Sequence, residues 1–202
     1  MNCADSSMAE QLDFLPVDGG SIPTSALQYN IRQIDKGTAA DVYRRHHYLA
    51  DKGFLHSYSF GALYDGIFWG AITFSIPNAR EIKGLYTQDN QSTVYEISRL
   101  AFDDRCIKNS ESRLIGFSIR LLRKMTDVSV ILSYADTAQN HEGVVYKATG
   151  FNYWGLTAQK TDFIHPDGKI KKLKGVKYSE LEGHWVKRSR KHLFVKQFGD
   201  SK

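Results

Sequence analysis

The stretch SYADTAQNHEGVVYKATGF, residues 133–151, carries the pattern on which the predicted fold depends. It continues an apolar run, VSVILSYA, whose unbroken hydrophobic character is typical of a strand buried on both faces. Asp136 follows that run directly, and a short helix is predicted around HEGVVYKAT, with Gly150 suited to its C-terminal cap. Because a strand tip aims a side chain from rigid backbone, Asp136 is a candidate catalytic or binding residue; an ordinary turn residue is the alternative.

The segments on either side continue an alternation of strands and helices. Strands are predicted at YNIRQI, STVYEISRLAF and FNYWGLTA, and two more, FLHSYSFGALY and IFWGAITFSI, are joined by the hairpin signal Asp65-Gly66. A helix over TAADVYRRHHYLAD is predicted to start at Thr38, with Asp41 completing a capping box. The helix SESRLIGFSIRLLRKM has an apolar stripe of Leu114, Phe117, Leu121, Leu122 and Met125. This order predicts an α/β (α+β) fold with a mixed central sheet flanked by helices.

Length and composition favour one domain. The chain has 202 residues, of which 42% are apolar. Residues 1–26 are predicted to form a flexible arm, and residues 27–202 a single domain whose C-terminal part, 162–202, is basic. The two cysteines have the spacing of neither a disulfide framework nor a zinc site, which favours a reducing, intracellular setting. No apolar run is long enough to span a bilayer, so we expect a soluble protein that is not exported and has no membrane partner.

Positive charge is concentrated after Asp162. From there to Lys202 the chain has 11 Lys and Arg against 5 Asp and Glu, although its total net charge is only +5. KIKKLKGVK (169–177) and HWVKRSRKHLFVK (184–196) mix cations with aromatic rings, which suits phosphate contacts and stacking on bases; a solvated basic hairpin is the alternative. The predicted DNA-contacting residues are Lys169, Lys171, Lys172, Lys174, Lys187, Arg188, Arg190 and Lys191.

The segment HEGVVYKATGFNYWG resembles the late helix and strand of acetyltransferases of the GNAT superfamily. In combination, HHYL, YEISRLAF, NSESRLIGFSIRLLRK and SYADTAQNHEGVVYKATGF resemble the Mom family of bacteriophage DNA-modification proteins, from about Tyr29 to Lys196. The resemblance implies a GNAT-like sheet with splayed central strands and an enzyme that converts adenine in DNA to its N6-carbamoylmethyl form, protecting it from restriction. It also implies the cytoplasm of a bacterial host and duplex DNA with the target adenine flipped out. A monomer and an oligomer are both compatible with the sequence.

The resemblance further implies six catalytic positions. They are His47 and Tyr48 at the end of the first helix, Ser98 and Arg99 on the central strand, Asp136 after the next strand, and Tyr146 on the late helix. Asp136 could accept the N6 proton or orient a histidine. His47 could be a general base, a hydrogen-bond donor or a metal ligand, and His46 competes with it because adjacent helix residues point in different directions.

The other positions have structural alternatives as well. Ser98 and Arg99 point to opposite faces of a regular strand, so only one of them would face a given cleft. Arg99 could clamp a phosphate or a carbonyl oxygen, or form a salt bridge with Glu96 or Asp136. Tyr146 could protonate a leaving group or pack against the sheet. Two neighbouring features are also of interest: Gly143 would allow close approach by donor or DNA, and Tyr153 and Trp154 could stack on a base or belong to the core.

The sequence leaves the acyl-type donor open. GNAT enzymes hold the pyrophosphate of coenzyme A on a glycine-rich turn before a helix, where this chain has DDRCIKNSESRLIG. Ser110 or Ser112 could cap that helix and meet an anion, but nearby carboxylates would repel phosphate. These carboxylates are Asp103, Asp104 and Glu111. Acetyl-CoA, an aminoacyl carrier and a metal-generated species all stay as candidate donors, and His47, Tyr48 and Asp136 could jointly hold iron.

Two other functions are compatible with the sequence. One is an N-acetyltransferase of a small amine or a protein, against which the missing glycine-rich turn argues. The other is a non-catalytic DNA-binding, anti-restriction protein on a GNAT fold, which the basic C-terminal segment fits equally well.

Overall fold

The computed structural model describes residues 21–50, 52–168 and 182–199. Its strands are β1 (Asn30–Ile34), β2 (Tyr58–Tyr64), β3 (Ile67–Ser75), β4 (Val94–Phe102), β5 (Val130–Asp136), β6 (Asn152–Leu156), β7 (Thr161–Ile164), β8 (His184–Lys187) and β9 (Lys191–Gln197). Its helices are α1 (Lys36–His46), α2 (Ser110–Met125) and α3 (Val144–Ala148), with short 3-10 turns η1 (Ala26–Gln28), η2 (Gln88–Asn90) and η3 (Thr137–Gln139). The predicted order of strands and helices is confirmed, while the single domain over 27–202 stays a prediction.

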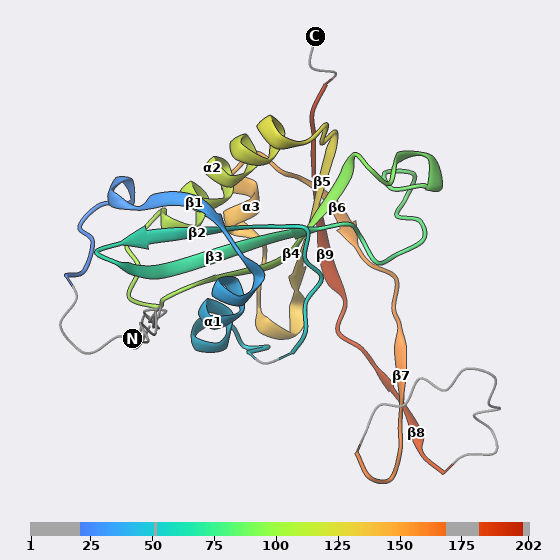
Figure 1. The fold of residues 1–202 in the computed structure, drawn as a ribbon. Helices are drawn as coiled ribbons and strands as arrows, with labels where there is room; N and C mark the ends of the chain where they lie inside the picture. Colours follow the sequence, from blue (N-terminus) through green and yellow to red (C-terminus); the bar gives the residue numbers. More distant parts are fainter. Residues whose placement is uncertain (1–20, 51, 169–181, 200–202) are drawn as a thin grey trace, which may run out of the picture.

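A seven-stranded mixed sheet in the order β1-β2-β3-β4-β5-β9-β6 forms the centre of the molecule. Figure 1 shows α1 below and α2 above the β1–β4 half of this sheet. Because helices cover both faces, β3 is buried along nearly its whole length, from Phe68 to Ser75. No helix in the described ranges is both long and apolar enough to cross a lipid bilayer.

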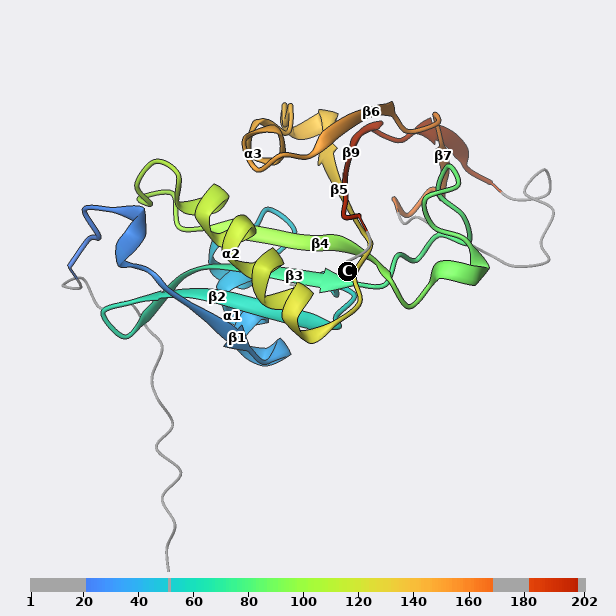
Figure 2. The ribbon, with the colours of Figure 1, turned by 90° about the horizontal axis from the view of Figure 1, so that it is seen from above.

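The parallel strands β4 and β5 pair over only three positions. The paired residues run from Val94 and Val130 to Glu96 and Leu132, after which the two strands diverge. Figure 2 shows the result from above: β5, β9 and β6 rise away from the half formed by β1 to β4. β5 instead pairs antiparallel with β9 along its full length, from Val130 to Asp136. The predicted splaying of the central strands is therefore present, and its apex is at Glu96.

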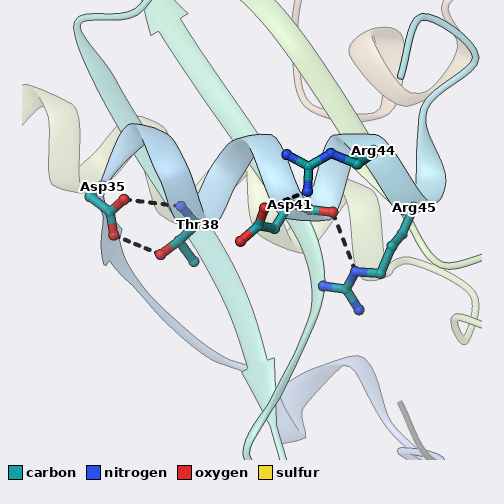
Figure 3. Close-up of polar contacts among 5 residues, drawn as sticks. All are labelled: Asp35, Thr38, Asp41, Arg44 and Arg45. Carbon is teal, nitrogen blue, oxygen red and sulfur yellow. Dashed lines mark hydrogen bonds and ion pairs between the residues drawn. The ribbon is translucent and has the colours of Figure 1, made fainter. Parts of the chain in front are cut away.

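Helix α1 starts two residues before the predicted cap and ends before the predicted end. Its N-cap is Asp35, whose carboxylate accepts hydrogen bonds from the backbone N–H of Thr38 at 3.0 Å and from its hydroxyl at 2.6 Å (Figure 3). Thr38 is thus the donor to the cap, and the carboxylate of Asp35 satisfies an orphan N–H of the first turn. The helix stops at His46, so Tyr48 lies in the following loop.

Helix α2 has the predicted range but a different buried face. Leu114 and Leu122 are buried as predicted, together with Ile115 and Ile119, whereas Met125 is 44% exposed. The difference arises because the sheet lies against the face on which Ile115 and Ile119 lie, so the last turn of the helix extends past the core.

Strands β7 and β8 form a separate two-stranded arm that extends from the main sheet (Figure 1). Strand β8 carries exposed aromatic and cationic side chains, among them Trp185 and Lys187. The predicted DNA contacts Lys169, Lys171, Lys172 and Lys174 lie outside the described residues.

Candidate active site

A cavity of about 620 Å³ lies where β4 and β5 diverge. All six predicted catalytic positions contribute to its wall: His47, Tyr48, Ser98, Arg99, Asp136 and Tyr146. The sequence-distant segments meet there because α1 ends at one side of β4 while η3 and α3 follow β5 on the other. Their catalytic roles stay predictions, but their convergence in one pocket is a property of the fold.

His47 is the C-terminal cap of α1 and is neutral. Burial, assisted by the charge of Arg99, lowers its pKa from 6.5 to about 4. Its ring Nδ1 accepts a hydrogen bond from the backbone N–H of Leu49 at 3.0 Å. An N–H can donate only to an unprotonated ring nitrogen, so the proton of the neutral ring is on Nε2. Of the three predicted roles, this arrangement favours that of hydrogen-bond donor; His46 also lines the pocket, so the two histidines do not exclude each other.

Tyr48 lies at the rim of the pocket, between two histidines. Its ring stacks on that of His47, with centroids 4.5 Å apart, and meets the ring of His141 edge-on at 6.4 Å. Its side chain is 51% exposed. Burial of its hydroxyl group and the charge of Asp136 raise its pKa, so the phenol stays protonated at neutral pH.

Ser98 and Arg99 both line the pocket, contrary to the prediction for a regular strand. On β4, Arg99 faces Thr73 and Ile97 faces Phe74, which leaves Ser98 without a partner on β3. This β-bulge re-aims the side chains, as bulges next to active sites do.

Both residues make polar contacts with the loop after α1, and the hydroxyl of Ser98 also lies 3.3 Å from the carbonyl oxygen of Thr73 on β3. The hydroxyl of Ser98 donates to the carbonyl oxygen of Leu55 at 2.8 Å, and Nη2 of Arg99 donates to those of Lys52 and Gly53 at 3.1 and 3.3 Å. The guanidinium also lies over the ring of Phe54, 5.7 Å from its centroid. The predicted salt bridge of Arg99 with Glu96 or Asp136 is absent from the described residues. Arg99 and Ser98 thus fix the loop that carries the neighbours of His47.

Asp136 is both a pocket residue and a turn residue, which are the two roles considered for it from the sequence. It lines the pocket, and its Oδ1 also accepts the backbone N–H of Ala138 at 3.0 Å as the cap of η3. Burial acts to raise its pKa, but hydrogen bonds from Ser189 and Ala138 and the charge of Lys191 outweigh burial and hold the pKa below its ordinary value. Asp136 is therefore a well-anchored carboxylate and a weak base.

Tyr146 is held in the pocket wall by aromatic contacts. Its ring centroid lies 5.8 Å from that of Phe151 and 5.6 Å from that of Phe194. Burial raises the pKa of its hydroxyl. Gly143 precedes the helix with φ of 68°, and a Cβ there would collide with the ring of Phe194. The close approach predicted at Gly143 is thus made by Phe194, so donor or DNA cannot approach its Cα from that side.

The pocket also contains ionisable residues that were not predicted to be catalytic, among them Glu96, Tyr134 and His141. Burial raises the pKa of Glu96 to about 7, although the charge of Lys191 opposes it. Burial and the charge of Glu96 raise the pKa of Tyr134 to about 12. The signal that would have identified Glu96 is an acid within the mostly apolar central strand VYEISRLAF, since acids are rarely buried without a partner or a function.

A second groove, of about 730 Å³, lies beside the start of α2. Its cations are Lys108, Arg113 and Arg120. None of the carboxylates predicted to repel phosphate lines it; Asp104 and Glu111 line the first pocket instead, and Asp103 is paired with Arg105 at 2.8 Å. The predicted serine caps are wrong, because Ser110 and Ser112 donate to the carbonyl oxygens of Ile107 and Asn109, and Asn109 is the N-cap.

The structure does not support the predicted iron site, because His47 is a poor ligand as it is held here. Because Nε2 of His47 carries the ring proton, it has no lone pair to give a metal, and the guanidinium of Arg99 adjoins the same ring with Nη1 3.5 Å from Nδ1. Asp136 uses one oxygen to cap η3. Over the ranges that the structure describes, no group of three or more His, Cys, Asp and Glu side chains is arranged to hold a metal ion.

The described DNA-contact candidates lie along the arm and the start of β9. Arg188 pairs with Asp162 across the arm at 3.2 Å, and Nε of Arg190 donates to the carbonyl oxygen of Thr157 at 2.8 Å. Lys187 is exposed, and Lys191 lines the pocket. The aromatic residues Tyr153 and Trp154, for which the core was one prediction, are 49% and 37% exposed.

Comparison with known proteins identifies a protein family that matches this chain. The model of the Mom protein family matches residues 28–200. A curated relative, the methylcarbamoylase mom of Escherichia phage Mu, is 32% identical over 75 residues, which are 37% of this chain and 30% of that protein. The match therefore spans less than a third of the relative's length.

Solved structures of similar fold are acetyltransferases. The ribosomal-protein-S5-alanine acetyltransferase of Vibrio fischeri has a TM-score of 0.52 at 16% identity, with 87% of this chain and 96% of that chain covered. The protein yncA of Salmonella typhimurium, described as an acetyltransferase and solved with its cofactor acetyl-CoA, has a TM-score of 0.53 at 14% identity, with 86% and 96% covered. At these identities the likeness shows the fold, which is GNAT-like as predicted.

Proposed function

This chain belongs to the Mom protein family, and from that premise we propose that it is a phage enzyme that modifies DNA. The proposed reaction is transfer of a carbamoylmethyl (acetamido) group to N6 of adenine in DNA, which protects the DNA from host restriction. The name of the phage Mu relative, a methylcarbamoylase, supports transfer of this group. The GNAT-like fold supports a transferase, because the similar solved structures are acetyltransferases.

The observation that carries the proposal is the single pocket between β4 and β5 in which all six positions meet. Adenine N6 is a poor nucleophile, so the enzyme must hold the base, remove a proton and place an electrophilic carbon at near-attack distance. The volume of about 620 Å³ is in the range of small-molecule sites. In this pocket, the Nε2–H of His47 donates to an acceptor atom of the base or the donor, while Asp136 and Tyr146 line the opposite side.

The base reaches such a pocket only when it has left the double helix, so the substrate is duplex DNA with the adenine flipped out. The β7–β8 arm supports this partner, since it projects from the domain and carries exposed cations such as Lys187 (Figure 1). A bound duplex would contact the arm and the start of β9, where Lys191 lies beside the pocket.

An acyl-CoA donor fits the second groove. Lys108, Arg113 and Arg120 would hold the phosphates of coenzyme A beside α2. To form the proposed product, the donor would have to present a methylene carbon, and not its acyl carbonyl carbon, to N6. The groove and the first pocket lie on either side of α2 and α3. Gly116 and Thr149 line the groove, whereas Glu111 and Val145 line the first pocket. An aminoacyl carrier is the other donor class.

Nucleoside mass spectrometry tests the proposed function. The chain is expressed in bacteria, their DNA is digested to nucleosides, and an adenosine adduct with the mass of a carbamoylmethyl group is sought. We expect the adduct with the natural chain and its loss in His47→Ala and Asp136→Ala. Arg44→Ala is the matched control, because Arg44 lies on the exposed side of α1 and is expected to keep the adduct.

The competing function is tested with the same purified protein. Calorimetry measures its affinity for coenzyme A, and a fluorescence titration measures its affinity for duplex DNA. Tight binding of coenzyme A without DNA binding and without an adduct would replace the proposal by an ordinary N-acetyltransferase.

A further inference from the structure

Glu96 lies where strands β4 and β5 separate. It is the last residue of β4 that pairs with β5, so its side chain stands at the apex of the divergence, inside the pocket. The residue is partly buried, and within the described ranges its carboxylate makes no hydrogen bond and no ion pair. A buried carboxylate without such partners is costly unless it is protonated, and in a cavity it faces whatever molecule fills that cavity.

Three acid–base groups that the resemblance assigns to catalysis are already engaged. The Nδ1 of His47 accepts the N–H of Leu49, so the ring has no lone pair to offer at Nε2. Asp136 is stabilised as an anion by the backbone N–H of Ala138 and by Ser189, which makes it a weak base. Tyr146 lies between two aromatic rings with its hydroxyl protonated. A base other than these three is therefore required, and Glu96 is the pocket carboxylate that lies where β4 and β5 separate.

We propose that Glu96 is the catalytic base of this pocket and accepts the proton of the target amino group. This inference rests on the proposed function. It assigns the role of proton acceptor to Glu96 and not to Asp136, which was the residue favoured by the sequence. In the step, the N6–H bond breaks and its proton goes to the Glu96 carboxylate, while N6 forms a bond to the methylene carbon of a carbamoylmethyl donor. The bond between that carbon and the leaving group of the donor breaks, and the leaving group takes the electron pair.

The surroundings of Glu96 suit this task. Its pKa is raised by burial to about 7, near the operating pH at which a general base is most effective. Lys191 on β9 and Tyr134 on β5 are the ionisable side chains that act on it from the neighbouring strands. The ammonium of Lys191 favours the ionised carboxylate and so keeps a fraction of the group ready to accept a proton.

The test compares Glu96→Gln with the natural chain. Glutamine keeps the shape and hydrogen-bonding capacity of the side chain but cannot accept the proton. We expect the adenosine adduct to fall at least about 100-fold, the usual contribution of a general base, with a melting temperature that does not decrease and with unchanged affinity for duplex DNA. Glu81→Gln changes an exposed glutamate away from the pocket and is expected to keep the adduct.

A second measurement uses the natural chain only and does not require that the variant folds. The side-chain carboxyl of Glu96 is followed by ¹³C NMR across a pH titration, with an expected midpoint near 7. A midpoint near the ordinary glutamate value of about 4.3 would overturn the inference, as would an adduct in folded Glu96→Gln at the level of the natural chain. Absence of an adduct in the natural chain would instead contradict the proposed function, and the titration would still decide whether Glu96 is a base of neutral pKa.

Discussion

Nη1 of Arg99 lies 3.5 Å from Nδ1 of His47, although the two residues belong to different elements and are 52 positions apart in the chain. Through this contact and its bonds to the loop carbonyl groups, Arg99 connects the end of α1 to the bulge of β4. Burial, assisted by this cation, lowers the pKa of the imidazole and keeps the ring neutral, and the neutral ring keeps its Nε2–H. The arrangement therefore fixes both the position and the protonation state of His47.

The neutral state of His47 gives a pH dependence of stability. Its pKa of about 4 in the folded chain lies below the ordinary value of 6.5, so the unfolded chain binds more protons between these pH values. Stability should therefore rise with pH across this window, and the contribution of His47 should be lost as the pH falls. In His47→Gln, urea denaturation should show a shallower dependence of the unfolding free energy on pH from 4 to 6.5. Equal slopes for the two proteins would contradict the assigned ring state.

Arg99→Ala should destabilise the domain. The substitution removes charge-assisted hydrogen bonds to Lys52 and Gly53 from a residue that is 6% exposed, so the unfolding free energy should fall by about 1.5–3 kcal/mol. Arg44→Ala is the matched control, since its pair with Asp41 is exposed and should cost at most about 1 kcal/mol. Urea denaturation measures both, and similar losses for the two variants would show that Arg99 does not anchor the loop.

Two glycine substitutions should have opposite signs. Gly143→Ala should lower stability by about 1–3 kcal/mol, because the residue has φ of 68° and its Cβ would meet Phe194. Gly116→Ala should raise stability by about 0.5–1 kcal/mol, because Gly116 lies inside α2 with open space at the Cβ position. Thermal unfolding distinguishes the outcomes, and a stabilising Gly143→Ala would contradict the close contact with Phe194.

The arm should contribute to DNA binding through charge. If Lys160 and Lys187 contact phosphates, each alanine substitution should weaken binding and make the slope of log affinity against log salt shallower by about 0.9. Fluorescence anisotropy at several salt concentrations measures the slope. Lys124→Ala, at the exposed last turn of α2, should leave the slope unchanged. A loss of affinity that is independent of salt would indicate that the arm acts through another kind of contact.

Periodicity predicted the sheet and its helices because each apolar pattern reports which face of an element is buried. It placed the helix over Ser110–Met125 correctly but chose Met125 for the buried stripe, since a pattern does not reveal where the neighbouring sheet ends. The start of α1 was misplaced for a similar reason. Asp35 and Thr38 both suit a cap, and the backbone conformation of Asp35 determines which of them accepts the hydrogen bonds.

The candidate site was predicted mainly from the resemblance to a family, while its geometry came from the structure. The bulge at Ser98 decides that both Ser98 and Arg99 reach the pocket, and no sequence period encodes a bulge that depends on the pairing of β3 with β4. The tautomer of His47 depends on the N–H of Leu49 in a loop without periodicity. Glu96 was considered only as a salt-bridge partner, because its significance follows from the point at which β4 and β5 part.

Strand β9 lies between β5 and β6, although it is synthesised after every other strand that the structure describes. Each residue of β5 from Val130 to Asp136 pairs with β9. The β9 edge of β5, which ends at Asp136 in the pocket wall, therefore has no hydrogen-bonded partner strand until residues 191–197 have left the ribosome. The half formed by β1 to β4 is built from antiparallel pairs of consecutive strands and can assemble earlier. A nascent chain should therefore hold a structured half-domain without a working pocket, and activity should appear only with the insertion of the last strand.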